Sequence, residues 1–381
     1  MNTASAAQPS SAKQLVSQPL IYDLGLLFSV LLLVGIGIVM VYSASSALAF
    51  KKFGNGYFFL KKQGFFAFSG VVVLVAFSYI PFRWYRAIAY PALLVSLILL
   101  ILVAFSPLGV KAGGAARWLQ IGPLQFQPSE LARMALVVYL SYSMSKKVDQ
   151  LGDFYVGFLP HVIVLGVFIL LLQAQPDFGA MVIFFLITWM MLFVGGCKLF
   201  HLSAVIPFLA PMAWFFMTSA DYRVKRLTSF LDPWKDSADT GYQVVHSLMA
   251  FGSGGITGVG LGKGYQKLFY LPEPHTDFIF SVVGEELGLV GVAIVVALYA
   301  VILIRCTAIS RQTRDRFGTL LATGITVSLG LQVCINMGVT LGLLPPKGLT
   351  LPFLSYGGTS LLINMAAIGI MMNIGAHGTR T

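Results

Sequence analysis

Long runs of apolar residues follow one another along most of this chain, and they limit its fold more than any other feature. A helix that crosses a bilayer needs ~20 mostly apolar residues, because lipid offers no partner for backbone polar groups. Charged residues make up 10% of the sequence, whereas soluble domains carry roughly 25%. We therefore predict an all-α integral membrane protein, a bundle of ten transmembrane helices. The spans are expected near residues 22–42, 64–80, 88–106, 131–145, 158–174, 178–196, 199–217, 277–304, 317–342 and 359–376, and the fourth is the weakest.

Three acids of the stretch Leu271–Gly288 fall within one expected membrane helix. Asp277 stands at the head of the expected eighth span, and Glu285 and Glu286 lie further along it. A charged side chain at the centre of a lipid-exposed helix costs at least ~2.5–3.5 kcal/mol. These carboxylates therefore need surroundings lined by protein or water. The alternative is that the span starts late and that all three acids are solvated anchors among the lipid headgroups.

The spacing of these acids argues against a site built from paired carboxylates. A rise of about 1.5 Å per residue separates Asp277 and Glu285 by ~12 Å along a helix. This exceeds the roughly 5–9.5 Å between the two carboxyl groups of glycosidases. Glu285 also lies about 80° around the helix from Asp277, and Glu286 about 180°. A single catalytic carboxylate, Asp277, is the better interpretation.

A second polar stretch precedes the expected fourth span. Arg117 beside Trp118 is typical of a membrane interface, where the guanidinium meets phosphates and the indole lies at headgroup depth. Ser129 is a candidate N-cap of the fourth helix, with Glu130 in its first turn. Arg133, one turn in, can pair with Glu130 or reach an anionic ligand. A purely structural helix start explains these residues equally well.

The long connection at 218–276 contains recognisable local patterns. Long loops in compact proteins are usually lids or binding surfaces. Tyr242–Phe251 has the pattern of a short amphipathic helix, and the glycine-rich run Gly252–Gly264 follows it. This run matches neither the phosphate loop nor the dinucleotide fingerprint. We expect it to form flexible turns or to allow a close approach between helices.

A third stretch, 343–360, is apolar but rich in proline and glycine, which favours a re-entrant or interfacial loop. Lys347 is its only cation. Alternate connections between spans lie on the same side of a membrane. This stretch, the stretch at 107–130 and the loop at 218–276 are therefore expected to face the same compartment as Asp277.

Charge and residue usage also bear on partners and orientation. The net charge of +11 suits anionic headgroups or pyrophosphates better than nucleic acid, because the basic residues are dispersed through short loops. The histidines and cysteines show no metal-binding spacing. Lys and Arg divide almost evenly between the two sets of loops, so the positive-inside rule does not orient the chain. Polar insertions in or beside the spans, such as Gln173-Ala-Gln-Pro-Asp177 and Asn336, make sense only if those helices face each other or a cavity.

In combination, several motifs resemble the SEDS family of membrane proteins (shape, elongation, division and sporulation). The matching residues are Ala116-Arg-Trp118 with Gln127-Pro-Ser-Glu130, Gly241-Tyr-Gln243, Leu271-Pro-Glu273 with His275-Thr-Asp-Phe-Ile-Phe280 and Glu285-Glu-Leu-Gly288, and Lys347-Gly-Leu-Thr-Leu-Pro352 with Ser355-Tyr-Gly-Gly358. The resemblance covers nearly the whole chain past Tyr22.

Within that family, three segments resemble the FtsW-like division branch more than the RodA elongation branch. They are Tyr265-Gln-Lys-Leu268, Gly284 and Leu344-Pro-Pro-Lys-Gly-Leu-Thr350. Two residues depart from the pattern. Arg133 stands where the family usually has Lys, which replaces a point charge by a planar fork. Phe269 stands where the division branch often has Glu, so a regulatory role of that acid is not expected here.

The resemblance implies ten helices with both termini cytoplasmic, in the bacterial cytoplasmic (inner) membrane at the division septum. The chain then divides into a cytoplasmic tail at 1–21, a membrane domain at 22–376 with an extracytoplasmic loop at 218–276, and a short cytoplasmic tail at 377–381. A peptidoglycan glycosyltransferase that uses lipid II is implied. Its partners would be a class B penicillin-binding protein (an FtsI-type transpeptidase) and other division membrane proteins, with no nucleic acid. Mg²⁺ or Mn²⁺ is a candidate cofactor.

On this interpretation, Asp277 is the general base that activates the 4-hydroxyl of the acceptor sugar, and undecaprenyl pyrophosphate leaves with inversion. Cations stabilise such a leaving group, and the candidates are Arg117, Arg133 and Lys347. The other residues expected to bind substrate are Trp118, Gln127, Glu130 and Ser355, and those expected to support Asp277 are His275, Thr276 and Glu285. Two alternatives stay open. A lipid II flippase would need polar residues through the full membrane depth, and a scaffold without activity would tolerate loss of Asp277.

Overall fold

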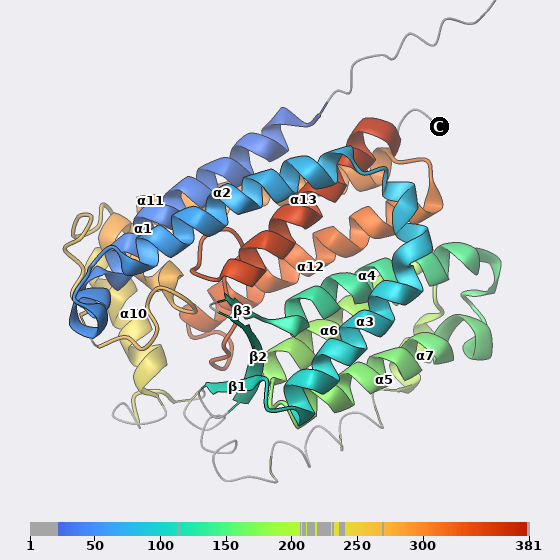
Figure 1. Cartoon of the computed structure of the whole chain (residues 1–381), viewed down its shortest axis with the longest axis horizontal. Helices are drawn as coiled ribbons and strands as arrows, with labels where there is room; N and C mark the ends of the chain where they lie inside the picture. Colours follow the sequence, from blue (N-terminus) through green and yellow to red (C-terminus); the bar gives the residue numbers. More distant parts are fainter. Residues whose placement is uncertain are drawn as a thin grey trace, which may run out of the picture.

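The structure, a computed structural model, is a bundle of long helices with one small sheet at one end (Figure 1). It describes residues 22–112, 115–122, 124–205, 207, 211, 218, 230, 232–235, 241–268 and 270–378. The expected tail at 1–21, the last three residues of the expected tail at 377–381, most of the seventh span at 199–217, Phe269 and much of the loop at 218–276 lie outside these residues.

Helices make up most of the described chain. Their bounds are α1 Leu24–Phe53, α2 Phe58–Tyr79, α3 Tyr85–Phe105, α4 Pro128–Lys146, α5 Leu159–Ala174, α6 Phe178–Gly195, α7 Leu199–Ala204, α10 Tyr242–Gly254, α11 Ile279–Gln312, α12 Arg316–Thr340 and α13 Gly358–Gly378. The strands are β1 Gly109–Ala112, β2 Ala115–Ile121 and β3 Leu124–Phe126, and short helical turns occur at Phe82–Trp84, Val148–Gln150 and Phe154–Phe158.

Within the described residues, eight helices are long and apolar enough to cross a membrane. They coincide with all the expected spans except the fourth and the seventh. The fourth, α4, is 19 residues long and is buried between α3, α6 and α12, so its polar residues are shielded by protein. The seventh is described only over Leu199–Ala204. The bundle is therefore broadly consistent with ten spans.

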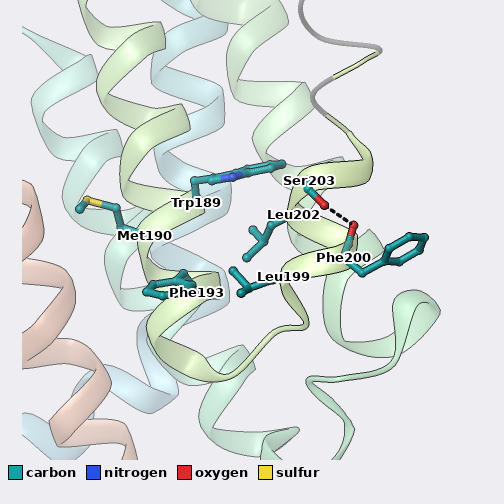
Figure 2. Close-up of a pocket in the computed structure, with 7 residues that line it drawn as sticks. All are labelled: Trp189, Met190, Phe193, Leu199, Phe200, Leu202 and Ser203. Atoms are coloured by element: carbon teal, nitrogen blue, oxygen red, sulfur yellow. Dashed lines mark hydrogen bonds between the residues drawn. The ribbon is translucent and has the colours of Figure 1, made fainter.

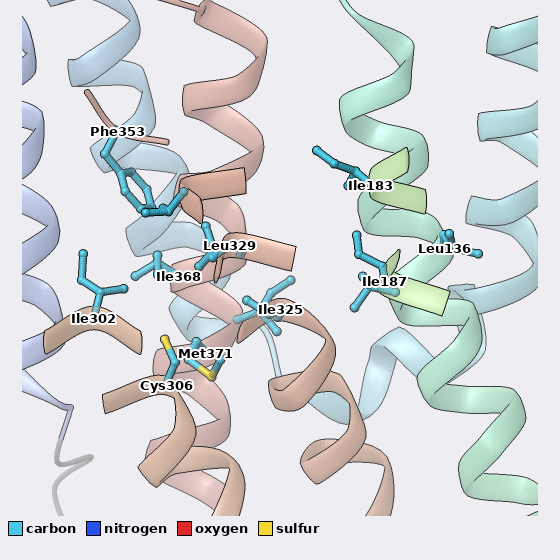
Figure 3. Packing of buried hydrophobic residues seen from close by; sticks show 14 of the residues in the cluster. Leu136, Ile183, Ile187, Ile302, Cys306, Ile325, Leu329, Phe353, Ile368 and Met371 are labelled. Atoms are coloured by element: carbon cyan, nitrogen blue, oxygen red, sulfur yellow. The ribbon is translucent and has the colours of Figure 1, made fainter. Parts of the chain in front are cut away.

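The core of the bundle is built around α12 and α13. α13 packs along α2 and also contacts α4, α11 and α12. Figure 3 shows Ile302 and Cys306 of α11 close to Met371 of α13, with Ile325 of α12 beside them. The outer helices α2 and α3 instead expose large apolar side chains, Phe68 among them. This distribution fits a bundle surrounded by lipid, because apolar side chains need no cover there.

A three-stranded antiparallel sheet stands where we predicted only a polar connection, as a small addition to the all-α bundle. The strands pair in the order β1-β2-β3, with Leu119 of β2 opposite both Gly109 and Phe126. Gly122 turns the chain between β2 and β3 with a φ of 62°, which favours glycine. β1 and β3 are only four and three residues long, and the seven residues of β2 do not alternate strictly between apolar and polar, so no strand pattern stands out.

The start of α4 also differs from the prediction. Gln127 is the N-cap and Pro128 the first helical residue, a place where the missing N–H of proline costs nothing. Ser129 lies inside the first turn, where its hydroxyl accepts a hydrogen bond from Gln127 Nε2 at 3.1 Å. The predicted N-cap role of Ser129 is therefore wrong. Glu130 lies in the first turn, as expected.

The amphipathic helix predicted at Tyr242–Phe251 is confirmed as α10, which packs along α11. The glycine run behind it brings the two backbones together. A methyl group on Gly258 would lie 2.1 Å from the carbonyl oxygen of Glu286, and the N–H of Gly260 donates to that same oxygen at 3.1 Å. α11 breaks its helical geometry at Gly288, where φ is 64°. Close approach is thus the correct one of the two interpretations for these glycines.

Glu285 and Glu286 are buried anions that hold this glycine-rich loop against α11. Glu285 accepts a hydrogen bond from the N–H of Tyr265 at 2.7 Å. Glu286 accepts from Lys267 Nζ at 2.5 Å and from the hydroxyl of Ser43 in α1 at 2.7 Å. Both carboxylates are fully paired inside protein, so neither is a headgroup anchor. Glu285 fixes the loop rather than contacting the acid that it was expected to support.

The two ends of the described chain lie at the same end of the bundle (Figure 1). Asp23, before α1, pairs with Arg305 near the end of α11 at 3.5 Å. A methyl group on Gly375, near the end of α13, would contact Ile309 of α11. The sheet and α10 lie at the opposite end (Figure 1). The predicted even number of crossings agrees with this arrangement.

Replacing Lys267 with Met should lower the thermal stability of the detergent-purified protein, because Glu286 would remain buried without its cation. Removing one partner of a buried ion pair typically costs ~3–5 kcal/mol. Scanning fluorimetry would report this as a lower Tm. The double variant Lys267→Met/Glu286→Gln removes the unpaired charge and should recover much of the loss. Equal Tm values for the single and double variants would contradict the explanation.

Candidate active site

Three connections between helices meet at the backbone of Gly348. A methyl group on this glycine would lie 3.2 Å from Arg117 Nη1 and 3.3 Å from Asp277 Oδ2, so the guanidinium and the carboxylate flank one point. Arg117 comes from β2, Asp277 from the turn before α11, and Gly348 from the segment between α12 and α13. The predicted convergence of these connections on one end of the bundle is confirmed.

The side-chain amide of Asn336, on α12, holds two of these connections in place. Its amide nitrogen donates to the carbonyl oxygen of Asp277 at 2.9 Å and to that of Leu349 at 2.6 Å. The side chain is buried, and its amide nitrogen finds both partners in the two loops that it joins, whereas its Oδ1 has no partner among the described residues. One amide therefore sets the position of the acid relative to the segment that carries Lys347 and Gly348.

The carboxyl of Asp277 has the properties of a proton acceptor near neutral pH. Its pKa is raised to about 7, and loss of hydration is the largest cause. The negative charge of Glu273 raises this pKa further, Arg117 opposes the rise, and Asp177 adds to it. A carboxyl with a pKa near the working pH can take up a proton and release it again. Asp277 itself belongs to the turn before Ile279, the first residue of the membrane helix α11.

His275 supports the turn before Asp277 as a packed, neutral ring. Its ring centroid lies 4.6 Å from that of Phe59 and 5.6 Å from that of Tyr356. Its carbonyl oxygen accepts a hydrogen bond from the N–H of Tyr356 at 2.9 Å. Burial, followed by the charge of Lys52, lowers its pKa to about 4. The imidazole is therefore uncharged at neutral pH and holds the turn by packing.

Thr276 and Ser355 stabilise the chain on either side of this ring. The hydroxyl of Thr276 donates to the carbonyl oxygen of Glu273 at 3.1 Å, which closes the turn before the acid. The hydroxyl of Ser355 accepts the N–H of Leu351 at 2.8 Å and is buried. The structure thus gives both residues a local structural partner.

Asp177 belongs to the site, although the sequence marked it only as a polar residue between two apolar runs. Its side chain is buried at the start of α6, where Oδ1 accepts the N–H of Ala180 at 3.3 Å. The same oxygen lies 3.5 Å from Arg117 Nε, and Arg117 Nη2 donates to the carbonyl oxygen of Pro176 at 3.3 Å. Arg117 is therefore held from the α6 side as it faces Asp277.

Lys347 brings a second positive charge to the same place. Burial lowers its pKa from the usual value, and the charge of Asp177 opposes this effect. Trp118 follows Arg117 on β2, is half-buried and stands opposite Val110 in the sheet. The positive charges of Arg117 and Lys347 thus both interact with the carboxylate of Asp177.

Arg133 is engaged inside the bundle. Its Nη2 donates to Glu130 Oε2 at 2.7 Å and to Asn364 Oδ1 at 3.1 Å, and its Nη1 donates to the hydroxyl of Ser328. Of the two uses that the sequence allowed, pairing with Glu130 is confirmed. The side chain is buried, so its charge joins α4 to α12 and α13. The structure does not place it with Arg117 and Asp277 over Gly348.

A small polar cavity of about 20 Å³ lies between α4, α6 and α12. Gln127, Glu130, Arg133, Asp177 and Gln332 are among the residues that line it. This is room for about one water molecule. Among the described residues, the carbonyl oxygen of Gln332 and Nε of Arg133 have no hydrogen-bond partner. The cavity therefore joins the Arg133 network to the buried side of Asp177.

A larger hollow between α6 and α7 is apolar (Figure 2). It is lined by Trp189, Met190, Phe193, Leu199, Phe200, Leu202 and Ser203. Trp189 lies ~18 Å along α6 from Asp177, at the rise of an α-helix. With no ionisable side chain in its lining, this hollow offers no acid–base chemistry.

Replacing Asn336 with Leu should lower the Tm of the purified protein, because the carbonyl groups of Asp277 and Leu349 would lose their buried donor. Leaving a buried polar group unpaired costs about 1–3 kcal/mol. Gln332→Leu is a matched control one turn away on α12. The side-chain oxygens of Gln332 and Asn336 both lack a partner among the described residues, but the amide nitrogen of Asn336 also donates to two loop carbonyl groups. A loss of stability as large in the control as in Asn336→Leu would argue against the clamp.

The chain matches the family model described as "Cell cycle protein", which takes in FtsW, RodA and SpoVE, over residues 24–380. A probable peptidoglycan glycosyltransferase FtsW from Geobacter sulfurreducens is 46% identical over 353 residues, which cover 93% of this chain and 95% of that protein. The protein of the same name from Trichlorobacter lovleyi is 45% identical over 355 residues, with 93% of each chain covered.

Two solved structures are similar along nearly the whole chain. One belongs to a study of how a peptidoglycan synthase complex coordinates polymerization and crosslinking. Its TM-score is 0.79 at 30% identity, covering 95% of this chain and 100% of the other. The rod shape determining protein RodA of Thermus thermophilus has a TM-score of 0.70 at 29% identity, covering 95% and 99%.

Proposed function

Because the chain belongs to the cell cycle protein family of FtsW, RodA and SpoVE, we propose that it is a peptidoglycan glycosyltransferase that polymerises lipid II during division. The observation that carries the proposal is the carboxyl of Asp277, whose pKa is about 7 and which faces Arg117 across Gly348. An acid poised near neutral pH can deprotonate a sugar hydroxyl, and a neighbouring cation can receive a departing pyrophosphate.

In the proposed reaction, ionised Asp277 removes the proton from the 4-hydroxyl of the acceptor sugar. That oxygen forms a bond to C1 of the N-acetylmuramic acid on the donor chain, opposite the leaving group, so the anomeric centre inverts. The bond from C1 to the pyrophosphate oxygen breaks, and undecaprenyl pyrophosphate departs with the electron pair. Pyrophosphate is already a good leaving group, so no second carboxylic acid has to protonate it. Asp277 then releases its proton to water.

The negative charge that develops on the pyrophosphate is balanced by Arg117 and Lys347. A half-buried cation interacts more strongly with such charge than one in bulk water, because the surroundings screen it less. Trp118, beside Arg117, suits the headgroup depth at which a lipid-linked pyrophosphate lies. Arg133, with Glu130 and Gln127, supports these groups from within the bundle, since its guanidinium is engaged by three side chains there.

A divalent cation, Mg²⁺ or Mn²⁺, is a candidate cofactor for this chemistry. Among the described residues, no group of three or more His, Cys, Asp or Glu side chains is placed to hold a metal ion. Mg²⁺ often keeps several waters and binds through substrate phosphates. A metal here would accordingly be held mainly by the pyrophosphate. The chain supplies the base and the cations described above.

The site lies at the end of the bundle opposite the two chain ends. This supports a topology with both termini in the cytoplasm and Asp277 at the outer face of the bacterial inner membrane, at the division septum. The solved synthase complex that coordinates polymerization with crosslinking supports a partner of the same kind. We propose a class B penicillin-binding protein of the FtsI type, together with other division membrane proteins.

A lipid II flippase is the second candidate, because the Arg133 network carries polar groups into the bundle. The cavity beside that network holds about 20 Å³, whereas a disaccharide headgroup needs far more room. A scaffold without activity would not need a carboxyl tuned to neutral pH. Both alternatives are therefore weaker than the transferase.

Asp277→Asn should abolish polymerisation of purified lipid II by the protein in complex with its cognate penicillin-binding protein. General-base catalysis contributes about 10²–10⁴-fold, so glycan chains should become at least ~100-fold scarcer on gels. The variant should keep its Tm and its partner, as shown by scanning fluorimetry and co-purification. Normal polymerisation by an intact variant complex would refute the role of Asp277 and bring the flippase forward.

The rate of polymerisation should rise with pH through about 7, because the carboxyl of Asp277 must be ionised to accept a proton and its pKa is about 7. Glu273→Gln removes a negative charge that raises this pKa. The acidic limb of the pH–rate profile should therefore move to lower pH in that variant. A limb that stays in place, or moves to higher pH, would contradict the assignment of the limb to Asp277.

A further inference from the structure

We propose that Asp177 is a positioning residue that holds Arg117 in place and keeps its guanidinium from pairing with Asp277. The inference rests on the proposed role of Asp277 as general base, and it adds a device that protects that role. Arg117 faces two carboxylates, one on the α6 side and one before α11. A general base must keep its lone pair for the substrate proton, so a cation beside it needs another counter-ion.

The contacts of Arg117 show how its guanidinium nitrogens are divided between the Asp177 side and the Asp277 side. Nε lies 3.5 Å from Asp177 Oδ1, and Nη2 donates to the carbonyl oxygen of Pro176 at 3.3 Å. The remaining terminal nitrogen, Nη1, is the one that lies above Gly348, on the side of Asp277. Two of the three nitrogens are therefore turned towards the start of α6. The third lies over Gly348 and faces the side of Asp277.

Asp177 is suited to act as a fixed counter-ion because its side chain is anchored and buried at the start of α6. Its oxygen also accepts the N–H of Ala180, which ties the carboxylate to the first turn of α6. Only 3% of the residue is exposed, so water does not compete for Arg117 from this side. Burial raises the pKa of Asp177, and the charges of Arg117 and Lys347 oppose that rise.

The charged groups around the two acids set the expected sign of a pH effect. Asp177 faces Arg117 from β2, Glu130 from α4 and Lys347 from the segment after α12. Asp277 faces Glu273 from its own turn, Arg117 and Asp177. Loss of the Asp177 charge removes one anion from this set and frees the guanidinium to move towards Asp277. Both changes stabilise ionised Asp277 and make it a weaker base.

Asp177→Asn is the decisive variant, assayed for lipid II polymerisation in the full complex from acidic to alkaline pH. We expect kcat to fall on the order of 10- to 100-fold, as misplacement of a charged group near the reacting atoms typically causes. We also expect the acidic limb of the profile to move to lower pH. Asp177→Glu keeps the carboxylate and should retain a limb near that of the wild type.

Asp315→Asn is a matched control at the opposite end of the bundle. Asp315 also begins a helix, accepting the N–H of Gly318 at 2.8 Å at the start of α12, and it pairs with Arg86. The Asn variant removes the ion pair while keeping a side-chain oxygen that can cap the helix, as in Asp177→Asn, but far from the site. The control should lower Tm without moving the limb.

The outcomes separate the two proposals. An unmoved limb in Asp177→Asn, with Asp277→Asn inactive, overturns the positioning role alone and leaves Asp177 a helix cap. Polymerisation by Asp277→Asn overturns the proposed function, and the positioning role with it. If Asp177→Asn is too slow for a profile, activity of Asp177→Glu at least about 10-fold higher supports the proposal. Equal loss in the Asn and Glu variants at unchanged Tm overturns it.

Discussion

Pairing of buried charge is the constraint on which this structure depends. A carboxylate removed from water loses several kcal/mol of hydration and needs a donor in return. Glu286 has Lys267, and Glu130 has Arg133, so both acids serve as fixed parts of the bundle. Asp277 differs, because the nearest arginine is already engaged by another acid. The cost of removing Asp277 from water is not offset by an ion pair of its own, and it raises the pKa of Asp277. This carboxyl is therefore available for chemistry, whereas the paired acids serve the structure.

The helices and their order could be predicted because the length of an apolar run and the alternation of loops are local properties of the chain. The convergence of the loops on Asp277 followed from that alternation alone. The small sheet could not, since its strands pair over too few residues to leave a pattern. The role of Asp177 escaped prediction for another reason. Its partner, Arg117, is far away in sequence, and only the folded chain brings the side chain of Arg117 to the start of α6.

Asp277 and Glu285 show why a charged residue in an apolar run cannot be assigned from sequence alone. Both occur in one stretch with similar neighbours. Glu285 meets the backbone of Tyr265 because the glycines before it let that loop approach α11. Asp277 instead faces the guanidinium of Arg117 across Gly348. The two acids differ because distant segments of the chain supply different partners to each carboxylate. These partners cannot be deduced from the sequence of one span.

The amide of Asn336 has a mechanical consequence for the membrane-embedded part of the protein. Because one nitrogen holds both Asp277 and Leu349, the acid and the segment that carries Lys347 follow any displacement of α12 together. A tilt of about 3° around the Arg316 end of α12 would carry Asn336 by roughly 1.5 Å. A rigid tilt of α12 would therefore carry the acid and this segment together, so the distance between Asp277 and the Lys347 segment would be kept by a single hydrogen-bonded amide.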